Sequence, residues 1–484
     1  MRVAPNQVVF RDPDAYPAIY GARANVRRSH FYTAFERKHD EPTTLTTVDV
    51  AEHHRRRKML SMAFTEKSVR ATSDFIVRHV DRWNQIMLDE NGSATEWSAV
   101  CDMSERVDQL SFDIMGDLSF GRSFDIKEPG DNPLKVIPHT IAAYMKFYYP
   151  VRALAPVCCL LADQSQMCRS PFIGLLAWLK PRGLDALFEL ISPPAVKEYN
   201  RFVYDSVTKG IALYKSQLEK PEEERRRDLL YFLCDAKDPD TGLPVYTEAD
   251  LRGESSLLVI AGSDTTAISL SSLFFYLTGD PGRCEKLVDE VLNTFPTAED
   301  IVYGPKLLGC TYTRACIDEA MRLTPSGPSE MPREILPGGQ EILGEHFPAG
   351  VVVGAAPWLD SRNHDVYGDE GSFRPERWIA GSSPDVTEDT VAAMRRNFNP
   401  FTTGLGACLG KNVAYAEMMI TIARTLHRLE VRRAPGSTFG GGRPELGLGA
   451  SNEEEMNVQD AFVTLRQGPE VQFRRRAPRK EAEI

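Results

Sequence analysis

The sequence lacks the paired cysteines of a zinc site. Its nine cysteines are scattered, are odd in number and include no two at C-x-x-C spacing. This pattern favours reduced thiols in a protein that faces the cytosol over a disulfide scaffold. The chain also lacks an excess of positive charge, because its net charge is -11. That balance argues against a general nucleic-acid-binding protein.

No internal repeat and no linker divides the 484 residues. We therefore expect one domain over residues 1–473 and a charged, disordered tail over residues 474–484. Residues 52–88 carry apolar side chains at helical spacing, whereas from residue 325 short apolar runs alternate with proline and glycine. Residues 461–473 predict a closing hairpin. The expected fold class is mainly α with a smaller β-rich part.

One apolar run is long enough to span a bilayer, at residues 255–277. Asp264 lies within this run, and an acid near the bilayer centre is expensive. We therefore expect a helix buried in the protein. At the N-terminus, residues 2–10 predict a strand, with neither a signal peptide nor a membrane anchor ahead of it.

The stretch FTTGLGACLG, residues 401–410, places a lone Cys408 among three glycines just before a helix-forming sequence. A dinucleotide-binding loop would need its third glycine one position earlier, and Asn412 breaks a phosphate-binding G-K-[ST] motif. A nucleophilic cysteine would need a histidine base, and none of the nine histidines is tied to Cys408 by its position. A small buried hydrophobic cysteine is the ordinary alternative.

A metal-bound thiolate accounts for more of these residues. Backbone N–H groups at a helix N-terminus stabilise an anionic sulfur. Glycines such as Gly404 and Gly410 let the main chain approach a flat macrocycle without Cβ clashes. Phe401 would add an apolar cover that excludes water.

Residues 401–410 resemble the F-x-x-G-x-[R/H]-x-C-x-G haem-binding loop of the cytochrome P-450 family. The resemblance implies the cytochrome P-450 fold and haem b as cofactor, with Cys408 as the axial ligand of the iron. It also implies that Phe401, Gly404 and Gly410 belong to the cofactor-binding loop.

The segment AGSDTT, residues 261–266, resembles the oxygen-activating part of the long central helix of this family. A threonine hydroxyl that bonds back to a carbonyl one turn earlier, together with Gly262, loosens a helix. The resemblance implies that Asp264 and Thr265 are catalytic and deliver protons during oxygen activation. A buried polar patch at a kink is the ordinary alternative.

Glu319 and Arg322 form an acid–base pair three residues apart on one expected helix face. Such pairs are common on protein surfaces and are worth little there. The segment FRPERW, residues 373–378, resembles the P-E-R-F segment of the family, with Trp378 in place of the usual phenylalanine. The resemblance implies a buried structural network of Glu319, Arg322 and Arg377 that supports the haem loop.

His53 and Arg57 lie one helical turn apart in a basic run and match the family's grip on a haem propionate. Arg333 lies where the family has another propionate contact. Arg55 and Arg56 lie between His53 and Arg57, and for them a solvated basic face is the more ordinary interpretation. Residues 113–121 also resemble a segment common in fungal members.

Two features depart from the family pattern. Gly406 replaces the arginine or histidine that usually contacts a propionate, so we expect weaker haem retention unless His53, Arg57 or Arg333 compensates. The membrane anchor of the microsomal members is absent from this chain. By resemblance we still expect the cytosolic face of the endoplasmic reticulum membrane. Residues 170–191 are consistent with a peripheral membrane contact and equally with a buried helix pair.

The resemblance implies a monooxygenase that inserts one oxygen atom from O2 into a small apolar substrate, by hydroxylation or epoxidation, in fungal secondary metabolism. Its electrons would come from a separate NADPH-cytochrome reductase, because no flavin domain follows the haem region. A reductase-independent haem-thiolate peroxygenase or isomerase, and a haem-free binding protein descended from the family, are the alternatives.

Overall fold

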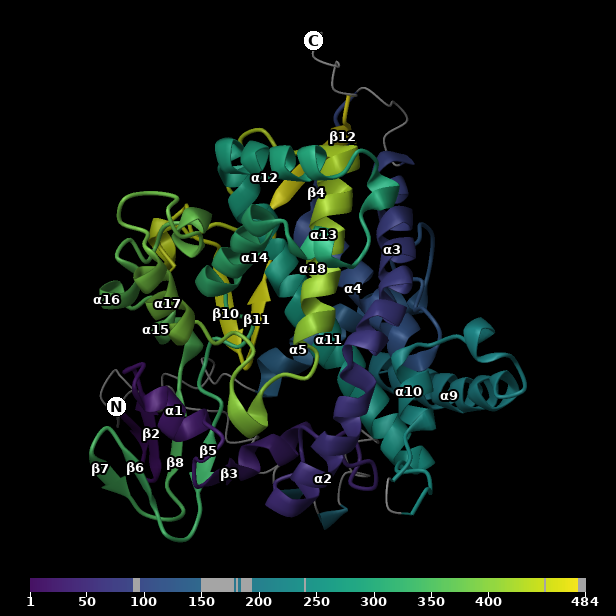
Figure 1. The fold of residues 1–484 in the computed structure, drawn as a ribbon, viewed down its shortest axis with the longest axis vertical. Coiled ribbons are helices and arrows are strands. Elements are labelled where there is room, and N and C mark those ends of the chain that lie inside the picture. Colours follow the sequence, from purple (N-terminus) through teal and green to yellow (C-terminus); the bar gives the residue numbers. More distant parts are fainter. Residues whose placement is uncertain are drawn as a thin grey trace.

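The computed structural model describes residues 1–89, 96–148, 178–179, 182–183, 194–238, 241–447 and 450–477. Figure 1 shows a large helical body with a smaller β-rich part beside the N-terminus. The α-helices are α1 (Ala15–Tyr20), α2 (Val50–Ser61), α3 (Glu66–Asp89), α4 (Met103–Phe120), α5 (Ile137–Tyr148), α9 (Pro194–Gln217), α10 (Leu229–Asp235), α11 (Glu248–Gly279), α12 (Pro281–Thr294), α13 (Pro305–Leu308), α14 (Thr311–Leu323), α15 (Pro357–Asp360), α16 (His364–Tyr367), α17 (Glu388–Asn397) and α18 (Lys411–Arg428). The architecture agrees with the mainly α fold that the sequence predicts.

Helix α11 runs through the middle of the helical body and contacts α4, α14 and α18. It begins at a capping box, in which the Thr247 hydroxyl and the Asp250 carboxylate each accept the other residue's backbone N–H. By length and composition α11 could cross a membrane, but 67% of its most apolar window is buried inside the protein. It is the buried helix that the sequence predicts.

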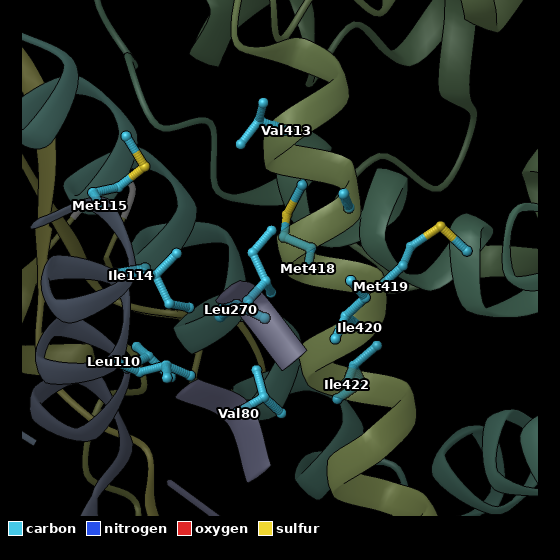
Figure 2. Packing of buried hydrophobic residues seen from close by; sticks show 14 of the residues in the cluster. Val80, Leu110, Ile114, Met115, Leu270, Val413, Met418, Met419, Ile420 and Ile422 are labelled. Atoms are coloured by element: carbon cyan, nitrogen blue, oxygen red, sulfur yellow. The ribbon is translucent and has the colours of Figure 1, made fainter. Parts of the chain in front are cut away.

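The main core lies between α4, α11, α18 and α3. Figure 2 shows Ile114 of α4, Leu270 of α11 and Ile420 of α18 directed toward the same interior, and all three are fully buried. Burying each such side chain contributes about 1.5–3 kcal/mol. This packing fixes α18, the helix that follows the cysteine loop.

Within the described residues the strands form four sheets. They are β1 (Arg2–Ala4), β2 (Gln7–Phe10), β3 (Val26–Arg28), β4 (Cys101–Asp102), β5 (Arg333–Ile335), β6 (Gln340–Ile342), β7 (Glu345–Phe347), β8 (Val352–Ala355), β9 (Leu429–Arg433), β10 (Val458–Ala461), β11 (Val463–Arg466) and β12 (Glu470–Arg475). The largest sheet has the order β1-β2-β8-β5-β3. The single strand predicted over residues 2–10 is in fact two strands, β1 and β2, which pair antiparallel.

Helix α1 covers this five-stranded sheet through a second, smaller core. Ala15 and Ile19 of α1 are fully buried against Ile335 of β5 and Val353 of β8. The sheet therefore carries α1 on one face and presents β3 and β5 toward α2 in the helical body (Figure 1).

The predicted closing hairpin over residues 461–473 is wrong. Strand β11 pairs with β10, whereas β12 pairs with β9 and β4 in another sheet. The predicted tail also begins too early, because Arg474 and Arg475 pair with Glu430 and Leu429 of β9. Residues 478–484 lie outside the described residues.

Candidate functional site

Cys408 lies in the loop just before α18. Its backbone N–H donates to the carbonyl of Phe401 at 2.8 Å. Burial raises the pKa of the Cys408 thiol, while the backbone N–H groups of Gly410 and Lys411 and the charge of Arg57 act against the rise. The thiol nevertheless keeps an exposed surface, unlike Cys310 and Cys316, which are buried. Cys408 is therefore not packed as a small buried hydrophobic residue.

The loop is pressed against α1 at Gly404. Gly404 has φ +61°, and a Cβ there would lie 2.3 Å from the carbonyl oxygen of Tyr20, so only glycine fits. The Thr402 hydroxyl donates to the carbonyl of Gly406 at 2.8 Å and closes the loop on itself. At Gly410 a Cβ would contact Cys408 Sγ at 3.7 Å, an ordinary distance.

Phe401 packs beside the start of α18. Its ring centroid lies 5.2 Å from that of Tyr415, and Lys411 Nζ lies 5.9 Å from the Phe401 centroid. The predicted apolar side chain therefore adjoins the cysteine loop.

His53 of α2 lies within electrostatic reach of Arg57 of α2 and Arg333 of β5. The structure adds Arg28 of β3, which lies within electrostatic reach of all three. We call these four residues the basic cluster. Among the described residues, no carboxylate oxygen lies within 4.0 Å of Arg28, Arg57 or Arg333. Arg57 also lies within electrostatic reach of Cys408.

Arg28 and Arg333 stand directly opposite each other in the antiparallel β3–β5 pair. Like charges at such positions destabilise a sheet. Burial and, next in size, the nearby charge of Arg333 together lower the pKa of Arg28 to about 10. This cross-strand pair, in which Arg333 is buried and Arg28 is half-buried, suits an anion beside these strands.

His53 supplies a second indication of a missing partner. Its Nε2 is buried and makes no hydrogen bond with any described residue. Burial, together with the charges of Arg28, Arg57 and Arg333, lowers the pKa of His53 to about 3. The imidazole is therefore neutral at pH 7 and has one N–H to donate.

The donor set fits haem. Three guanidinium groups with no described carboxylate oxygen within 4.0 Å, and a neutral imidazole with an unused buried nitrogen, suit the two propionates. A thiol that keeps an exposed surface at a helix N-terminus suits an axial ligand of the iron.

Arg55 and Arg56, which lie between His53 and Arg57, differ from each other. Arg55 is exposed, whereas Arg56 is buried and donates to Asp250 at 2.8 Å. The solvated-face interpretation is thus wrong for Arg56.

The middle of α11 carries the predicted proton-delivery residues. The Thr265 hydroxyl donates to the carbonyl of Ala261 at 2.7 Å, as the sequence predicts. Ala261 is exposed although the helix is buried on either side of this turn. Gly262 lets α4 approach, because a Cβ there would lie 2.6 Å from Met115. The helix nevertheless remains continuous through this turn.

Asp264 is linked to two residues that the sequence did not single out. Arg466 of β11 places Nη1 3.7 Å from Asp264 Oδ1 and Nη2 2.5 Å from Asp108 Oδ1. Burial raises the pKa of Asp264 to about 7; Arg466 lowers it and Asp108 raises it. Near neutral pH this carboxyl can therefore both hold and release a proton.

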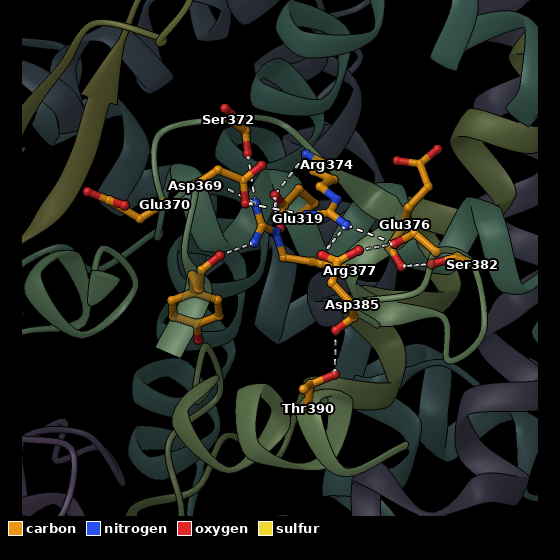
Figure 3. Close-up of polar contacts among 12 residues, drawn as sticks. Glu319, Asp369, Glu370, Ser372, Arg374, Glu376, Arg377, Ser382, Asp385 and Thr390 are labelled. Atoms are coloured by element: carbon orange, nitrogen blue, oxygen red, sulfur yellow. Dashed lines mark hydrogen bonds and ion pairs between the residues drawn. The ribbon is translucent and has the colours of Figure 1, made fainter. Parts of the chain in front are cut away.

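Glu319, Arg322 and Arg377 meet in one buried network. Arg322 Nε donates to Glu319 Oε2 at 2.8 Å, and Arg377 Nε donates to Glu319 Oε1 at 2.9 Å. Figure 3 shows Arg377 between Glu319 and Asp369. Trp378 Nε1 donates to Glu319 Oε2 at 3.0 Å, a bond that the family's usual phenylalanine cannot make. The arginines hold the pKa of Glu319 below its ordinary value against the effect of burial.

The network joins α14 to the segment before the cysteine loop. Arg322 Nη1 donates to the carbonyls of Ser361 and Glu370, at 2.8 and 2.7 Å. Trp378 packs against Phe398, just upstream of the loop, with ring centroids 4.8 Å apart. The network thus fixes the segment that leads to the Cys408 loop without contacting Cys408.

The predicted membrane contact at residues 170–191 falls almost wholly outside the described residues.

Comparisons with known proteins agree with this geometry. A family model described as cytochrome P-450 matches residues 4–167 and 183–440. A cytochrome P-450 monooxygenase of Gibberella zeae is 31% identical over 462 residues, which cover 95% of this chain and 97% of the relative. The cytochrome P-450 monooxygenase fscF of Fusarium equiseti is 29% identical over 489 residues, covering 98% and 84%. A crystal structure of a cytochrome P-450 shares the fold, with a TM-score of 0.67 at 18% identity over 97% of this chain and 89% of that chain.

Proposed function

This chain belongs to the cytochrome P-450 family, and from that premise we propose that it is a haem-thiolate monooxygenase acting on an apolar, medium-sized organic substrate. It inserts one oxygen atom from O2 by hydroxylation or epoxidation. The observation that carries the proposal is the placement of Cys408, which has two backbone N–H groups directed at its sulfur and the basic cluster close by.

Each part of the site has one task in this proposal. Cys408 binds the haem iron, and the basic cluster binds the propionates through charge-assisted hydrogen bonds. Phe401 excludes water from the sulfur. Bound haem supplies the iron that activates O2, and the thiolate donates electron density that favours O–O cleavage.

Asp264 and Thr265 manage protons. Asp264 holds a proton on its carboxyl near neutral pH because burial raises its pKa to about 7. Arg466 restrains that carboxyl from one side. The Thr265 hydroxyl donates its hydrogen to the carbonyl of Ala261, which keeps its oxygen oriented and able to accept a hydrogen bond.

The partners follow from the family. We propose that electrons come from an NADPH-dependent flavoprotein reductase, and that the protein works at the cytosolic face of the endoplasmic reticulum with a peripheral membrane contact through residues 170–191. The relatives named above are monooxygenases from fungi, which supports a role in fungal secondary metabolism.

The carbon monoxide difference spectrum of the reduced, haem-loaded protein tests the proposal. We expect the red-shifted band of a thiolate-bound haem, and its loss in Cys408→Ser. Cys284→Ser is the matched control, because Cys284 is half-buried in α12 and distant in sequence from the loop. A colourless protein after haem supply, or an unchanged spectrum in Cys408→Ser, would refute the assignment.

Turnover experiments then separate the monooxygenase from the alternative enzymes. Product formation with NADPH, reductase and O2 supports the proposal. Turnover with hydrogen peroxide alone, and none with reductase and NADPH, would instead show a peroxygenase.

A further inference from the structure

Arg466 of β11 faces two acids, Asp108 of α4 and Asp264 of α11, and binds them unequally. Its Nη2 lies 2.5 Å from Asp108 Oδ1, within hydrogen-bond distance, whereas its Nη1 lies 3.7 Å from Asp264 Oδ1, beyond that distance. One guanidinium group therefore serves two carboxylates and is hydrogen-bonded to only one of them.

The guanidinium group is held in this unequal position. Its Nε donates to the Ser271 hydroxyl at 3.2 Å, and that hydroxyl donates in turn to the carbonyl of Ala267 at 2.7 Å. Only 5% of the Arg466 side chain is exposed. Because the group is planar and two of its nitrogens are bonded elsewhere, Nη1 cannot move onto Asp264 without disturbing the bond to Asp108 or to Ser271.

The Asp264 carboxyl is otherwise unsupported. No described residue donates a hydrogen bond to its oxygens. Its side chain keeps 16% of its surface exposed, and Ala261, one turn earlier in α11, is exposed as well. This carboxyl is therefore placed to exchange protons with water.

Two further ionisable groups lie near these acids. His139 of α5 and Asp102 at the start of α4 are both within electrostatic reach of Asp108. Burial raises the pKa of Asp108, and Arg466 acts against that rise. On the pKa of Asp264, Arg466 has a larger effect than Asp108, and the two effects are opposite in direction.

We infer that Asp108 is a positioning residue for the proposed oxygen chemistry, because it holds Arg466 at hydrogen-bond distance and prevents the guanidinium group from closing an ion pair with Asp264. The inference rests on the proposed function. It explains how the carboxyl of α11 can take up and release a proton although an arginine lies beside it. Without the charge of Asp108, Arg466 would pair with Asp264 and hold it in its ionised form.

The variant Asp108→Asn tests this inference, because asparagine keeps the size and one acceptor oxygen but removes the charge that competes for Arg466. An arginine that pairs with an aspartate lowers the pKa of that aspartate by about one unit or more. We therefore expect Asp264 to titrate about one pH unit or more lower in Asp108→Asn than in the unmodified protein. The double variant Asp108→Asn/Arg466→Gln should titrate at or above the unmodified protein, because Arg466 has the larger effect on Asp264.

Infrared spectroscopy of the haem-loaded protein, produced with carboxyl-labelled aspartate, measures this titration. The band of interest is the C=O stretching band of the protonated carboxyl that is missing in Asp264→Asn. Glu105→Gln is the matched control, since it removes one negative charge from an exposed position of the same helix, where Glu105 accepts a hydrogen bond from Gln109. Far-UV circular dichroism checks that each variant is folded.

NADPH consumption with reductase and O2, without added organic substrate, gives a second measurement. A carboxyl whose pKa falls by about one unit is protonated about tenfold less often above both pKa values and equally often below them. Relative to the unmodified protein, the rate in Asp108→Asn should therefore fall about tenfold above about pH 8 and return to parity below about pH 5. A merely structural role of Asp108 would lower the rate equally at every pH.

The outcomes separate this inference from the proposed function. If the reduced, haem-loaded protein lacks the carbon monoxide band of a thiolate-bound haem, both fail. If that band is normal, the inference alone is overturned by any of three results: Asp264 titrates no lower in Asp108→Asn, Glu105→Gln shifts it as far, or the double variant titrates as low as Asp108→Asn. A rate ratio that does not change with pH would also overturn it.

Discussion

Replacing Glu319 with glutamine should strongly destabilise the fold. The Glu319 carboxylate accepts five hydrogen bonds, from Arg322 Nε and Nη2, Arg377 Nε, Trp378 Nε1 and the backbone N–H of Arg374. Glutamine keeps the size but has one acceptor oxygen, and its amide hydrogens would face donors. Two buried guanidinium groups would also lose their counter-charge. Removing one partner of such a buried pair costs about 3–5 kcal/mol, against a total stability of about 5–15 kcal/mol.

Urea unfolding followed by far-UV circular dichroism, on haem-loaded protein, measures this loss. Trp378→Phe provides the scale, because it removes one of the five donors and leaves the charges paired; we expect about 1.5–3 kcal/mol for one hydrogen bond to a charged group. The reasoning is refuted if Glu319→Gln lowers the free energy of unfolding no more than Trp378→Phe does. That result would mean that the carbonyls around Arg322 and Arg377 satisfy the guanidinium groups alone.

Two further predictions concern the chemistry and the pH dependence. Thr265→Ala should lower product formed per NADPH consumed by about tenfold or more. Ser263→Ala, which removes the same type of hydroxyl-to-carbonyl bond two residues earlier in α11, should not. Equal coupling in both variants contradicts a proton role. Glu417 is buried with one side-chain partner, the Ser111 hydroxyl at 2.8 Å, and burial raises its pKa from 4.5 to about 8. Because the folded chain keeps Glu417 protonated, this group stabilises the fold fully below about pH 4.5, and that contribution is lost as pH rises to about 8. Across this window the free energy of unfolding of the unmodified protein should fall by up to about 1.4 kcal/mol per pH unit relative to that of Glu417→Gln. Parallel stability curves would show that Glu417 ionises freely.

Motifs that are local in sequence were predictable. The loop around Cys408 and the Glu319–Arg322 pair lie on continuous segments, so their spacing fixes which side chains face one direction. The back-bonded Thr265 followed from the same helical geometry. In each case one continuous segment, with no information from elsewhere in the chain, carries the residues concerned.

Residues that strand pairing brings to the site were not predictable in the same way. Arg28 joins the basic cluster because β3 pairs with β5 in a register that sets it opposite Arg333. Arg466 reaches Asp264 from β11, about two hundred positions later in the chain. The wrong closing hairpin has the same origin, since a turn sequence after β11 shows that the chain reverses but not which strand it joins.

Trp378 lies between these two cases. The sequence identified it as a substitution in a family segment, and its position was therefore known. Its function became visible only when its indole N–H was found 3.0 Å from Glu319. A departure from a motif can thus add a bond to a network, as well as remove one.

The basic cluster has a consequence for how this protein matures. Three guanidinium groups that form no ion pair with any described carboxylate raise the free energy of the haem-free folded chain, and the haem that neutralises them binds only to the folded chain. Each tenfold excess of free haem over its dissociation constant then raises the free energy of unfolding by about 1.4 kcal/mol. In a cell that makes the polypeptide faster than haem, we expect the haem-free chains to unfold more often and to be degraded first. The level of the protein should then follow the cell's supply of iron and porphyrin.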